Sequence, residues 1–177
     1  MDLTYTQVKR LYKKKKYNFC TGTYNLNIFG IRDTCFENDT FNDYIGVAYE
    51  DDLCQKKVDI YPGTTDPSEH WMRNPLSKSG CIIMLERQYR GCYKIGTHGR
   101  TGNFPYTALE QCAPMDYARD NNKDNVLDID LSKKISEIYK TNLHRCSRYK
   151  IVRYIGRYSA GCQVVQDPKH FDAVLLN

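Results

Sequence analysis

Residues 24–49 read YNLNIFGIRDTCFENDTFNDYIGVAY, and both ends of this stretch have the residue pattern of a β-strand. Apolar and polar side chains alternate around a period of two in residues 24–31, and a second strand-like run, residues 43–49, follows after the turn-rich segment ENDTFN. This alternation is typical of strands that bury one face. A third short run follows at residues 57–61. The stretch therefore predicts a series of consecutive strands.

Strand-like runs continue through the rest of the chain. They are residues 80–86 and 89–97, which predict a hairpin joined at Arg87 and Gln88, residues 108–117, residues 135–146 and 149–154, which could pair, and the segment YSAGCQVV. Short strands at close intervals, separated by turn residues, are typical of sandwiches and barrels. We therefore expect a mainly β, single-domain sandwich or barrel, for which 177 residues suffice.

The two ends of the chain have helical patterns. Residues 4–14, TYTQVKRLYKK, carry apolar residues at helical spacing behind a threonine cap, and a helical turn is expected at residues 168–175. The lysine run at residues 13–16 fits either a solvated helix end or an electrostatic foothold on an anionic polymer, nucleic acid or cell wall. We divide the chain into a basic helical segment, residues 1–20, and a β-rich catalytic domain, residues 21–177.

Charge and hydropathy narrow the cellular context. The chain has 26 lysines and arginines against 21 acidic residues, a modest positive excess. No run approaches the roughly 18 apolar residues of a membrane span, and the N-terminus lacks the apolar segment of a signal peptide. We therefore expect synthesis in the cytoplasm, so that any action outside depends on release by another route. No RNP-like, helix-turn-helix or zinc-finger pattern indicates a nucleic-acid partner.

The cysteines do not have the spacing of a structural zinc site, because no two of them form a C-x-x-C pair. The eight positions are Cys20, Cys35, Cys54, Cys81, Cys92, Cys112, Cys146 and Cys162. The even count is compatible with disulfides, but a cytoplasmic start favours free thiols. Several of them lie in apolar runs, where cysteine acts as a small hydrophobic residue.

Cys162 and His144, 18 residues apart, are the candidate catalytic pair. A nucleophilic cysteine needs an imidazole to take its proton, and the two residues need only be neighbours in the fold. Gly161 lets substrate and backbone approach closely, and Ser159 can orient the turn. Arg145 could hold a substrate carboxylate. The same residues also fit a buried structural thiol and a hydrogen-bonded histidine.

The segment from His144 to Cys162 has the pattern H-x14-S-A-G-C. It resembles the signature of the YkuD-type L,D-transpeptidase catalytic domain, in which a histidine precedes an S-H-G-C or T-H-G-C element by about this interval. The resemblance implies a mainly β domain whose cysteine attacks a peptide carbonyl in peptidoglycan, forming an acyl-enzyme that an amine or water resolves. It assigns Cys162 as the nucleophile, His144 as its base, and Ser159 and Gly161 as the turn that shapes the oxyanion site.

Two departures from that pattern concern the substrate contacts more than the nucleophile. Ala160 stands where the family has a second histidine, and Gln163-Val164 replaces an apolar residue followed by arginine or asparagine. His98, in the segment THGR, could line the same cleft as a second imidazole, or lie in a surface turn. Trp71, beside His70 in the proline-rich loop of residues 62–79, could bind a sugar by stacking, or simply pack on that loop.

Other segments also resemble small uncharacterised phage and prophage proteins that end in an HR...SAGC motif. They are IYPGTTDP, RQYRGCYKIGTHG and HRCSRYKIVRYIGRYSAGCQVVQDP. The resemblance implies a peptidoglycan partner and an enzyme that cleaves or exchanges a stem-peptide or cross-link amide, in host lysis as an endolysin or in wall penetration. Such a protein is made in the host cytoplasm and acts at the cell wall after release or as part of a virion. The alternative is a noncatalytic wall-binding or virion module on the same fold.

An acidic loop is the one candidate metal site. Asp120, Asn122, Asp124 and Asp128 occupy positions 1, 3, 5 and 9 of a pattern whose alternating oxygen ligands suit calcium. Leu131, however, stands at position 12, where an EF-hand has a bidentate glutamate. The loop fits either a calcium site or a turn rich in aspartate and asparagine. The proposed chemistry itself requires no cofactor.

Overall fold

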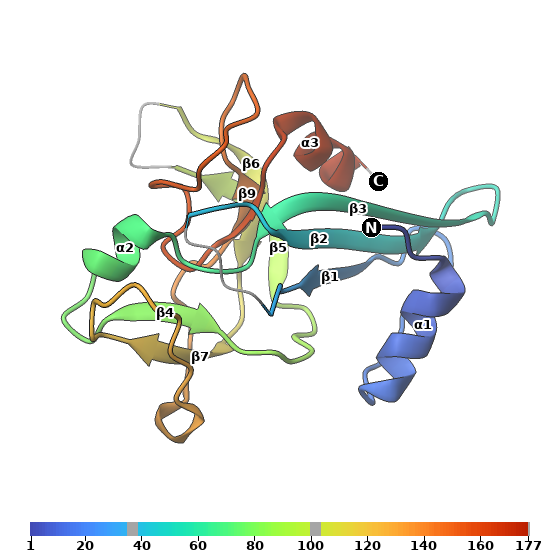
Figure 1. Cartoon of the computed structure of the whole chain (residues 1–177). Helices are drawn as coiled ribbons and strands as arrows, with labels where there is room; N and C mark the ends of the chain where they lie inside the picture. Colours follow the sequence, from blue (N-terminus) through green and yellow to red (C-terminus); the bar gives the residue numbers. More distant parts are fainter. Residues whose placement is uncertain (35–38, 100–103, 177) are drawn as a thin grey trace.

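The computed structural model describes residues 1–34, 39–99 and 104–176, and this part of the chain is mainly β with a short N-terminal helix (Figure 1). The strands are β1 (Asn27–Ile31), β2 (Asp43–Glu50), β3 (Lys56–Thr64), β4 (Cys81–Met84), β5 (Tyr93–His98), β6 (Tyr106–Gln111), β7 (Met115–Asp120), β8 (Ile135–Glu137), β9 (Leu143–Arg145) and β10 (Gln163–Val165). The helices are α1 (Tyr5–Lys14), α2 (Glu69–Arg73), α3 (Pro168–Leu176) and the 3-10 turn η1 (Leu131–Lys133). The predicted mainly β class is confirmed.

The described strands form two sheets. The larger has seven strands in the order β1-β2-β3-β10-β9-β6-β5, and the smaller has three in the order β4-β7-β8. Strands β9 and β10 are parallel, whereas β3 pairs with β10, and β6 with β9, in the antiparallel sense. Strand β9, which carries His144, and strand β10, which begins one residue after Cys162, therefore lie in the interior of the larger sheet.

Strands β1 to β3 are the consecutive strands that residues 24–31, 43–49 and 57–61 predict, and they pair in the antiparallel sense. Gly30 pairs with Ile45 across β1 and β2, and Ile45 pairs with Tyr61 across β2 and β3. Five consecutive residues of β2, from Ile45 to Tyr49, are buried. The reason is that β2 lies between two strands and is covered on both faces.

Helix α3 covers one face of the larger sheet beside β9 and β10 (Figure 1). Its Phe171 and Val174 are buried with residues of four strands, namely Ile45, Ala108, Leu143 and Val165. Because Leu143 and Val165 face this core, the neighbouring residues of β9 and β10 point to the opposite face. The core thus decides which side of the sheet carries His144.

Helix α1 packs against the larger sheet through its buried face. Thr4 caps it in a reciprocal arrangement with Gln7, as the sequence pattern predicts. Tyr5 and Val8 pack with Ala48 of β2, which attaches the basic N-terminal segment to the sheet. In the described part of the chain, no helix has both the length and the apolar character needed to cross a bilayer.

Two sequence predictions about strand pairing and one about a loop were wrong. Residues 80–86 and 89–97 do not form a hairpin, because β4 pairs with β7 and β5 pairs with β6. Residues 149–154 form no strand, and only Tyr154 makes an isolated bridge, to Thr40. The predicted loop of residues 62–79 contains the end of β3 and helix α2, which Ser68 caps. Alternation reveals that a segment is extended, but it does not reveal its partner.

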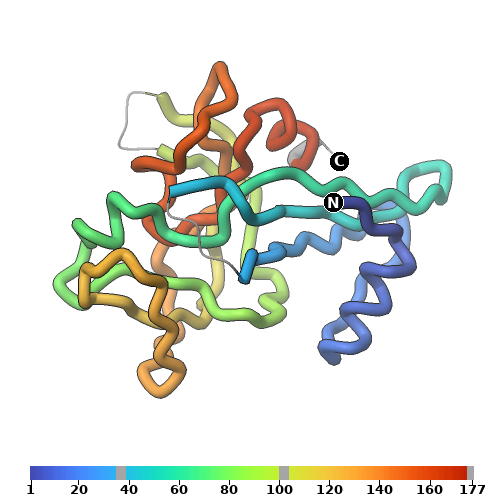
Figure 2. Tube along the Cα trace, viewed as in Figure 1, coloured from blue at the N-terminus to red at the C-terminus, as the bar shows by residue number. Residues whose placement is uncertain are grey.

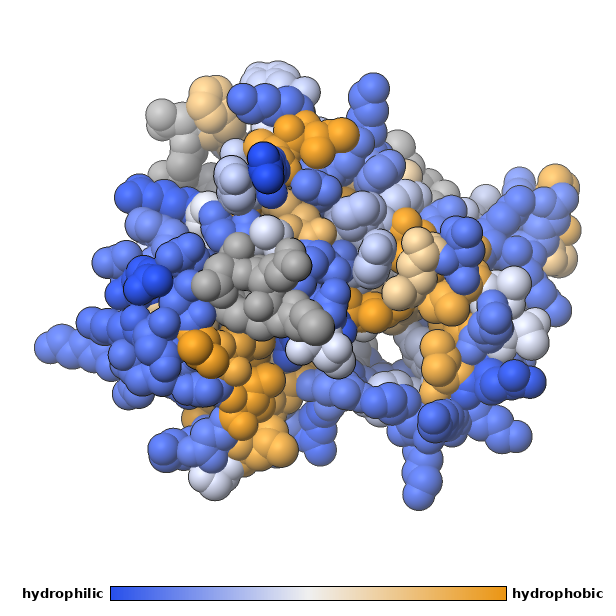
Figure 3. Space-filling model, viewed as in Figure 1, coloured by the Kyte–Doolittle hydropathy of each residue, from blue (hydrophilic) through white to orange (hydrophobic). Residues whose placement is uncertain are grey.

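The surface seen in Figure 3 is largely hydrophilic, with apolar residues in separate patches. All four lysines of residues 13–16 are exposed. Lys13 and Lys14 lie in the last turn of α1, where positive charge interacts favourably with the helix dipole. Lys15 forms an ion pair with Glu86. These contacts fit a solvated helix end, and the foothold on an anionic polymer stays a prediction.

Candidate active site

The parallel pair β9 and β10 brings the backbone at Cys162 close to the strand that carries His144. His144 pairs with Val164, and Gln163 N donates to Asn142 O at 3.0 Å, so Cys162 stands opposite Asn142. Cys162 lies one residue before β10, two positions along the chain from Val164, the partner of His144. The pairing of β9 with β10 thus brings together two residues that are 18 positions apart in the sequence.

The ring of His144 is buried and held by one of its two nitrogens. Its Nδ1 lies 2.7 Å from Arg145 O and 3.1 Å from the Tyr106 hydroxyl. A carbonyl oxygen can only accept a hydrogen bond, so Nδ1 carries the proton and donates to it. Nε2 then has a free lone pair, and among the described residues it has no hydrogen-bond partner. His144 is therefore oriented as a base with Nε2 as the accepting atom.

Burial keeps both members of the pair uncharged. It lowers the pKa of His144 to about 3, with a further contribution from His98, and it raises the pKa of Cys162 to about 11. The Cys162 thiol donates to Lys140 O at 3.7 Å. The thiol and the imidazole thus rest as a neutral pair.

Ser159 holds the turn that precedes Cys162. Its hydroxyl, fully buried, lies 2.8 Å from Cys162 O and 2.7 Å from Asp66 O, and it accepts from Gly161 N at 3.3 Å. Gly161 has a φ of 117°, and a Cβ there would lie 2.7 Å from Ile82 O. Glycine is required at this position for both reasons. The sequence analysis assigned Ser159 and Gly161 to the turn before Cys162. The structure shows the hydrogen bonds that hold this turn.

A second segment anchors this turn from outside. Ser68 N donates to Ser159 O at 2.9 Å, so the chain after β3 lies beside the chain before β10 (Figure 2). Asp66 lies in this anchoring segment, and its Oδ1 is 2.7 Å from Arg32 Nε. Burial raises the pKa of Asp66 to about 6, despite the opposing effect of Arg32. The sequence analysis did not select Asp66 or Arg32. Asp66 nevertheless belongs to IYPGTTDP, one of the segments that resemble phage proteins.

The hairpin of β5 and β6 supplies the other contacts to His144. His98 and Tyr106 stand opposite each other near its end. The ring of His98 stacks on that of His144 with a centroid separation of 3.8 Å, and Asn142 Nδ2 donates to His98 Nδ1 at 3.2 Å. Burial lowers the pKa of His98. A second imidazole thus lies beside His144, as the sequence suggested.

Tyrosines surround the thiol, and the sequence analysis missed them. The charge of Cys162 contributes to the raised pKa values of Tyr93, Tyr106 and Tyr117, after the larger effect of burial. Tyr106 also donates to Arg145 O at 3.0 Å, the same oxygen that orients His144. The high tyrosine content of the chain is the only sequence signal for this lining.

Arg145 and Trp71, the two other candidates for substrate binding, are engaged within the protein. The Arg145 guanidinium lies 4.2 Å from the centroid of the Tyr106 ring, and its Nη1 is 3.6 Å from Asp172 Oδ1 of α3. Trp71, on α2, donates from Nε1 to Arg157 O at 3.1 Å. Trp71 therefore lies near the turn that leads to Cys162, and Arg145 contacts the aromatic ring beside His144.

The acidic loop after β7 closes on itself. Asn122 Nδ2 donates to Asp124 Oδ2 at 3.0 Å and to Asp128 Oδ2 at 2.8 Å, and Asp128 N donates to Asp120 Oδ2 at 3.2 Å. Asn125 has a φ of 69°, a left-handed conformation that asparagine adopts more readily than most residues. No group of three or more histidine, cysteine or acidic side chains is arranged to hold a metal ion within the described residues. The contacts formed here are those of a turn rich in aspartate and asparagine.

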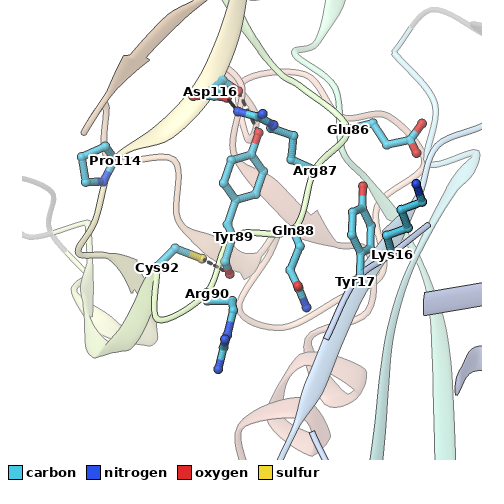
Figure 4. A pocket seen from close by; sticks show the side chains of 10 residues that line it. All are labelled: Lys16, Tyr17, Glu86, Arg87, Gln88, Tyr89, Arg90, Cys92, Pro114 and Asp116. Carbon is cyan, nitrogen blue, oxygen red and sulfur yellow. Dashed lines mark hydrogen bonds and ion pairs between the residues drawn. The ribbon is translucent and has the colours of Figure 1, made fainter. Parts of the chain in front are cut away.

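A polar cleft lies apart from this site. It is lined by Lys16, Tyr17, Glu86, Arg87, Gln88, Tyr89, Arg90, Cys92, Pro114 and Asp116 (Figure 4). Neither Cys162 nor His144 belongs to its lining, and its charged groups partly pair with each other, as Arg87 does with Asp116. The cleft therefore contributes no residue to the cysteine–histidine pair.

The chain was compared with protein-family models, with curated proteins and with solved structures, and none of the three comparisons gives a match.

Proposed function

We propose that this protein is a peptidoglycan-active cysteine enzyme, in which Cys162 attacks a stem-peptide or cross-link amide carbonyl. The observation that carries the proposal is the orientation of His144. Its Nδ1 is fixed by Arg145 O, and its Nε2 has no hydrogen-bond partner among the described residues, while β9 and β10 pair so that Cys162 precedes the strand next to His144. The resemblance of the segment from His144 to Cys162 to YkuD-type L,D-transpeptidases supports the substrate class.

The proposed reaction uses groups that this chain supplies. The thiol proton moves to His144 Nε2 as sulfur attacks the carbonyl carbon, and the imidazolium then protonates the leaving amine. The remaining acyl-enzyme is a thioester at Cys162. Water, activated by the neutral imidazole, resolves it by hydrolysis, whereas an amine acceptor would give exchange.

The developing negative charge on the carbonyl oxygen requires donors near Cys162. The Gly161 N–H is already used by Ser159 Oγ, at 3.3 Å. The backbone N–H of Cys162 donates to none of the described residues, so it is the candidate donor to this oxygen. In this proposal Ser159 and Gly161 hold the turn, and Cys162 supplies both the nucleophile and the oxyanion contact.

The test is incubation of purified protein with isolated peptidoglycan, followed by mass spectrometry of the soluble fragments. Wild type is compared with Cys162→Ala and His144→Asn, and Cys20→Ala, which removes an exposed thiol, serves as the control. New fragments are expected with wild type and with the control alone. Fragments released equally by Cys162→Ala would overturn the mechanism, and their identity in wild type names the bond.

A noncatalytic wall-binding or virion module is the second candidate, and the neutral state of the pair favours it. The raised pKa of Cys162 and the lowered pKa of His144 are what a purely structural thiol and imidazole would also show. Sedimentation with insoluble peptidoglycan distinguishes the two functions. Binding by wild type and Cys162→Ala alike, with no fragments from either, would support the module.

A further inference from the structure

Two cysteines outside the candidate active site stand opposite each other at the base of the β5–β6 hairpin. Tyr93 pairs with Gln111 in the ladder, and the next residues outward are Cys92 and Cys112. Cys112 N donates to Cys92 O at 2.8 Å, so the antiparallel pairing continues to these positions. Among the seven described cysteines, all of which are free thiols, the strand registers place only these two opposite each other.

The two sulfur atoms point to the same side. Directly opposite residues of an antiparallel pair share a face. Cys92 Sγ donates to Tyr89 O at 3.2 Å (Figure 4), and Cys112 Sγ donates to Gly91 O at 3.4 Å, so both thiols contact the short turn that precedes β5. Opposite residues have Cα atoms roughly 4.5–5.5 Å apart, and disulfides span about 4.4–6.8 Å. The Cα separation of such a pair is therefore compatible with a disulfide.

We infer that Cys92 and Cys112 are a paired dithiol that a small-molecule disulfide, such as oxidised glutathione, closes into a cross-strand disulfide. Cys112 is exposed and Cys92 is buried, which sets the order of the steps. The Cys112 thiolate attacks one sulfur of the oxidant and releases the first glutathione thiolate. Cys92 then attacks the Cys112 sulfur and releases the second. Two cysteine protons end on two glutathione thiols, so the oxidant takes up both electrons.

The second step limits the rate. Burial raises the pKa of Cys92 to about 11, and the charge of Cys112 adds to the rise. Only a small fraction of Cys92 is thiolate near neutral pH, and that fraction grows about tenfold for each pH unit below the pKa. Closure of the disulfide is therefore slow at neutral pH and faster in mildly alkaline solution.

The crosslink ties the hairpin that contacts His144. His98 and Tyr106 lie at the other end of β5 and β6 from the two cysteines. A disulfide at the base keeps these strands paired and so maintains the support for the His144 ring. This consequence for activity rests on the proposed function, whereas formation of the disulfide does not.

The experiment is peptide mapping of the full chain after treatment with oxidised glutathione in mildly alkaline buffer. Free thiols are alkylated in denaturant and the protein is digested for mass spectrometry. A linked pair of peptides containing Cys92 and Cys112 is expected in wild type and in Cys54→Ser, which removes a distant exposed thiol. In Cys112→Ser, Cys92 is expected to remain fully alkylated. The crosslinked protein should also melt at a higher temperature.

A stable glutathione adduct on Cys112 with Cys92 still alkylated would overturn the inference, as would linkage of Cys112 to another cysteine. The wild-type map decides this even when Cys112→Ser does not fold. Reduced and crosslinked protein are also tested on peptidoglycan. If both forms are inactive, the result counts against the proposed function only. The peptide map decides separately whether the disulfide forms.

Discussion

Replacement of His144 by asparagine tests whether this imidazole is held neutral in the folded protein. Asparagine can keep the hydrogen bond to Arg145 O, because its side-chain amide donates from nearly the position of Nδ1. It removes the titrating ring, however. In the folded state the pKa of His144 is about 3, against an ordinary value of 6.5, and the side chain is 2% exposed. The structure therefore predicts a defined change in the pH dependence of stability.

The sign follows from proton uptake. A group whose pKa is lowered on folding is neutral in both states above pH 6.5 and takes up a proton only in the unfolded state between 6.5 and about 3. Stability is then present above the unfolded pKa and is lost as the pH falls, by about 1.4 kcal/mol per unit. At about pH 4.5 the loss attributable to His144 is roughly 2.7 kcal/mol. His144→Asn should not show this part of the loss.

The assay is urea unfolding of both proteins at pH values from about 7.5 to 4.5. The slopes of unfolding free energy against pH are then compared. Asp66 acts in the opposite direction, since its raised pKa of about 6 makes the folded state take up a proton, but it is present in both proteins and cancels. His70→Asn is measured beside them as the control for loss of a histidine outside this site. Equal slopes in wild type and His144→Asn would refute the reasoning. So would a His144 ring that titrates near its ordinary value by NMR, a measurement that needs no variant.

Four further predictions concern the turn, the dithiol and the acidic loop. Gly161→Ala should lower the unfolding free energy by about 2–4 kcal/mol, because it combines a left-handed φ of 117° with a clash against Ile82 O. Gly156→Ala, at a φ of 56° in open space, should lower it by only about 1–2 kcal/mol in the same urea assay. Equal losses in the two variants would contradict the clash. Ser159→Ala should lower the unfolding free energy by about 1–3 kcal/mol, since it leaves the buried Gly161 N–H without its acceptor, and the exposed Ser79→Ala is the control. Closure of the Cys92–Cys112 disulfide should raise the unfolding free energy by about 3 kcal/mol and the melting temperature by several degrees. An unchanged calorimetric transition would show that the disulfide is strained. The calcium hypothesis predicts a higher melting temperature on adding calcium and loss of that rise in Asp124→Asn; no shift in wild type would contradict it.

The sequence by itself determined the fold class, because the residue pattern within each strand reflects the surroundings of that strand. The alternation in residues 24–31 and the strand-like run at residues 43–49 both indicate an extended chain, and β1 and β2 form there. The capped pattern at residues 4–14 likewise specifies α1. Pairing depends on which apolar faces meet, and that information is distributed over the chain. This is why β4 pairs with β7 and not with the adjacent β5.

The sequence also selected Cys162, His144 and the turn residues between them, through a motif that lies within 19 consecutive positions. The tertiary structure alone decided their chemistry. It buried the ring of His144, fixed its tautomer through Arg145 O, and placed His98 and Tyr106 from a distant hairpin against it. It also put Cys92 opposite Cys112, which are 20 residues apart in sequence. Burial and hydrogen-bond partners arise from contacts between segments far apart in the chain, so no local pattern records them.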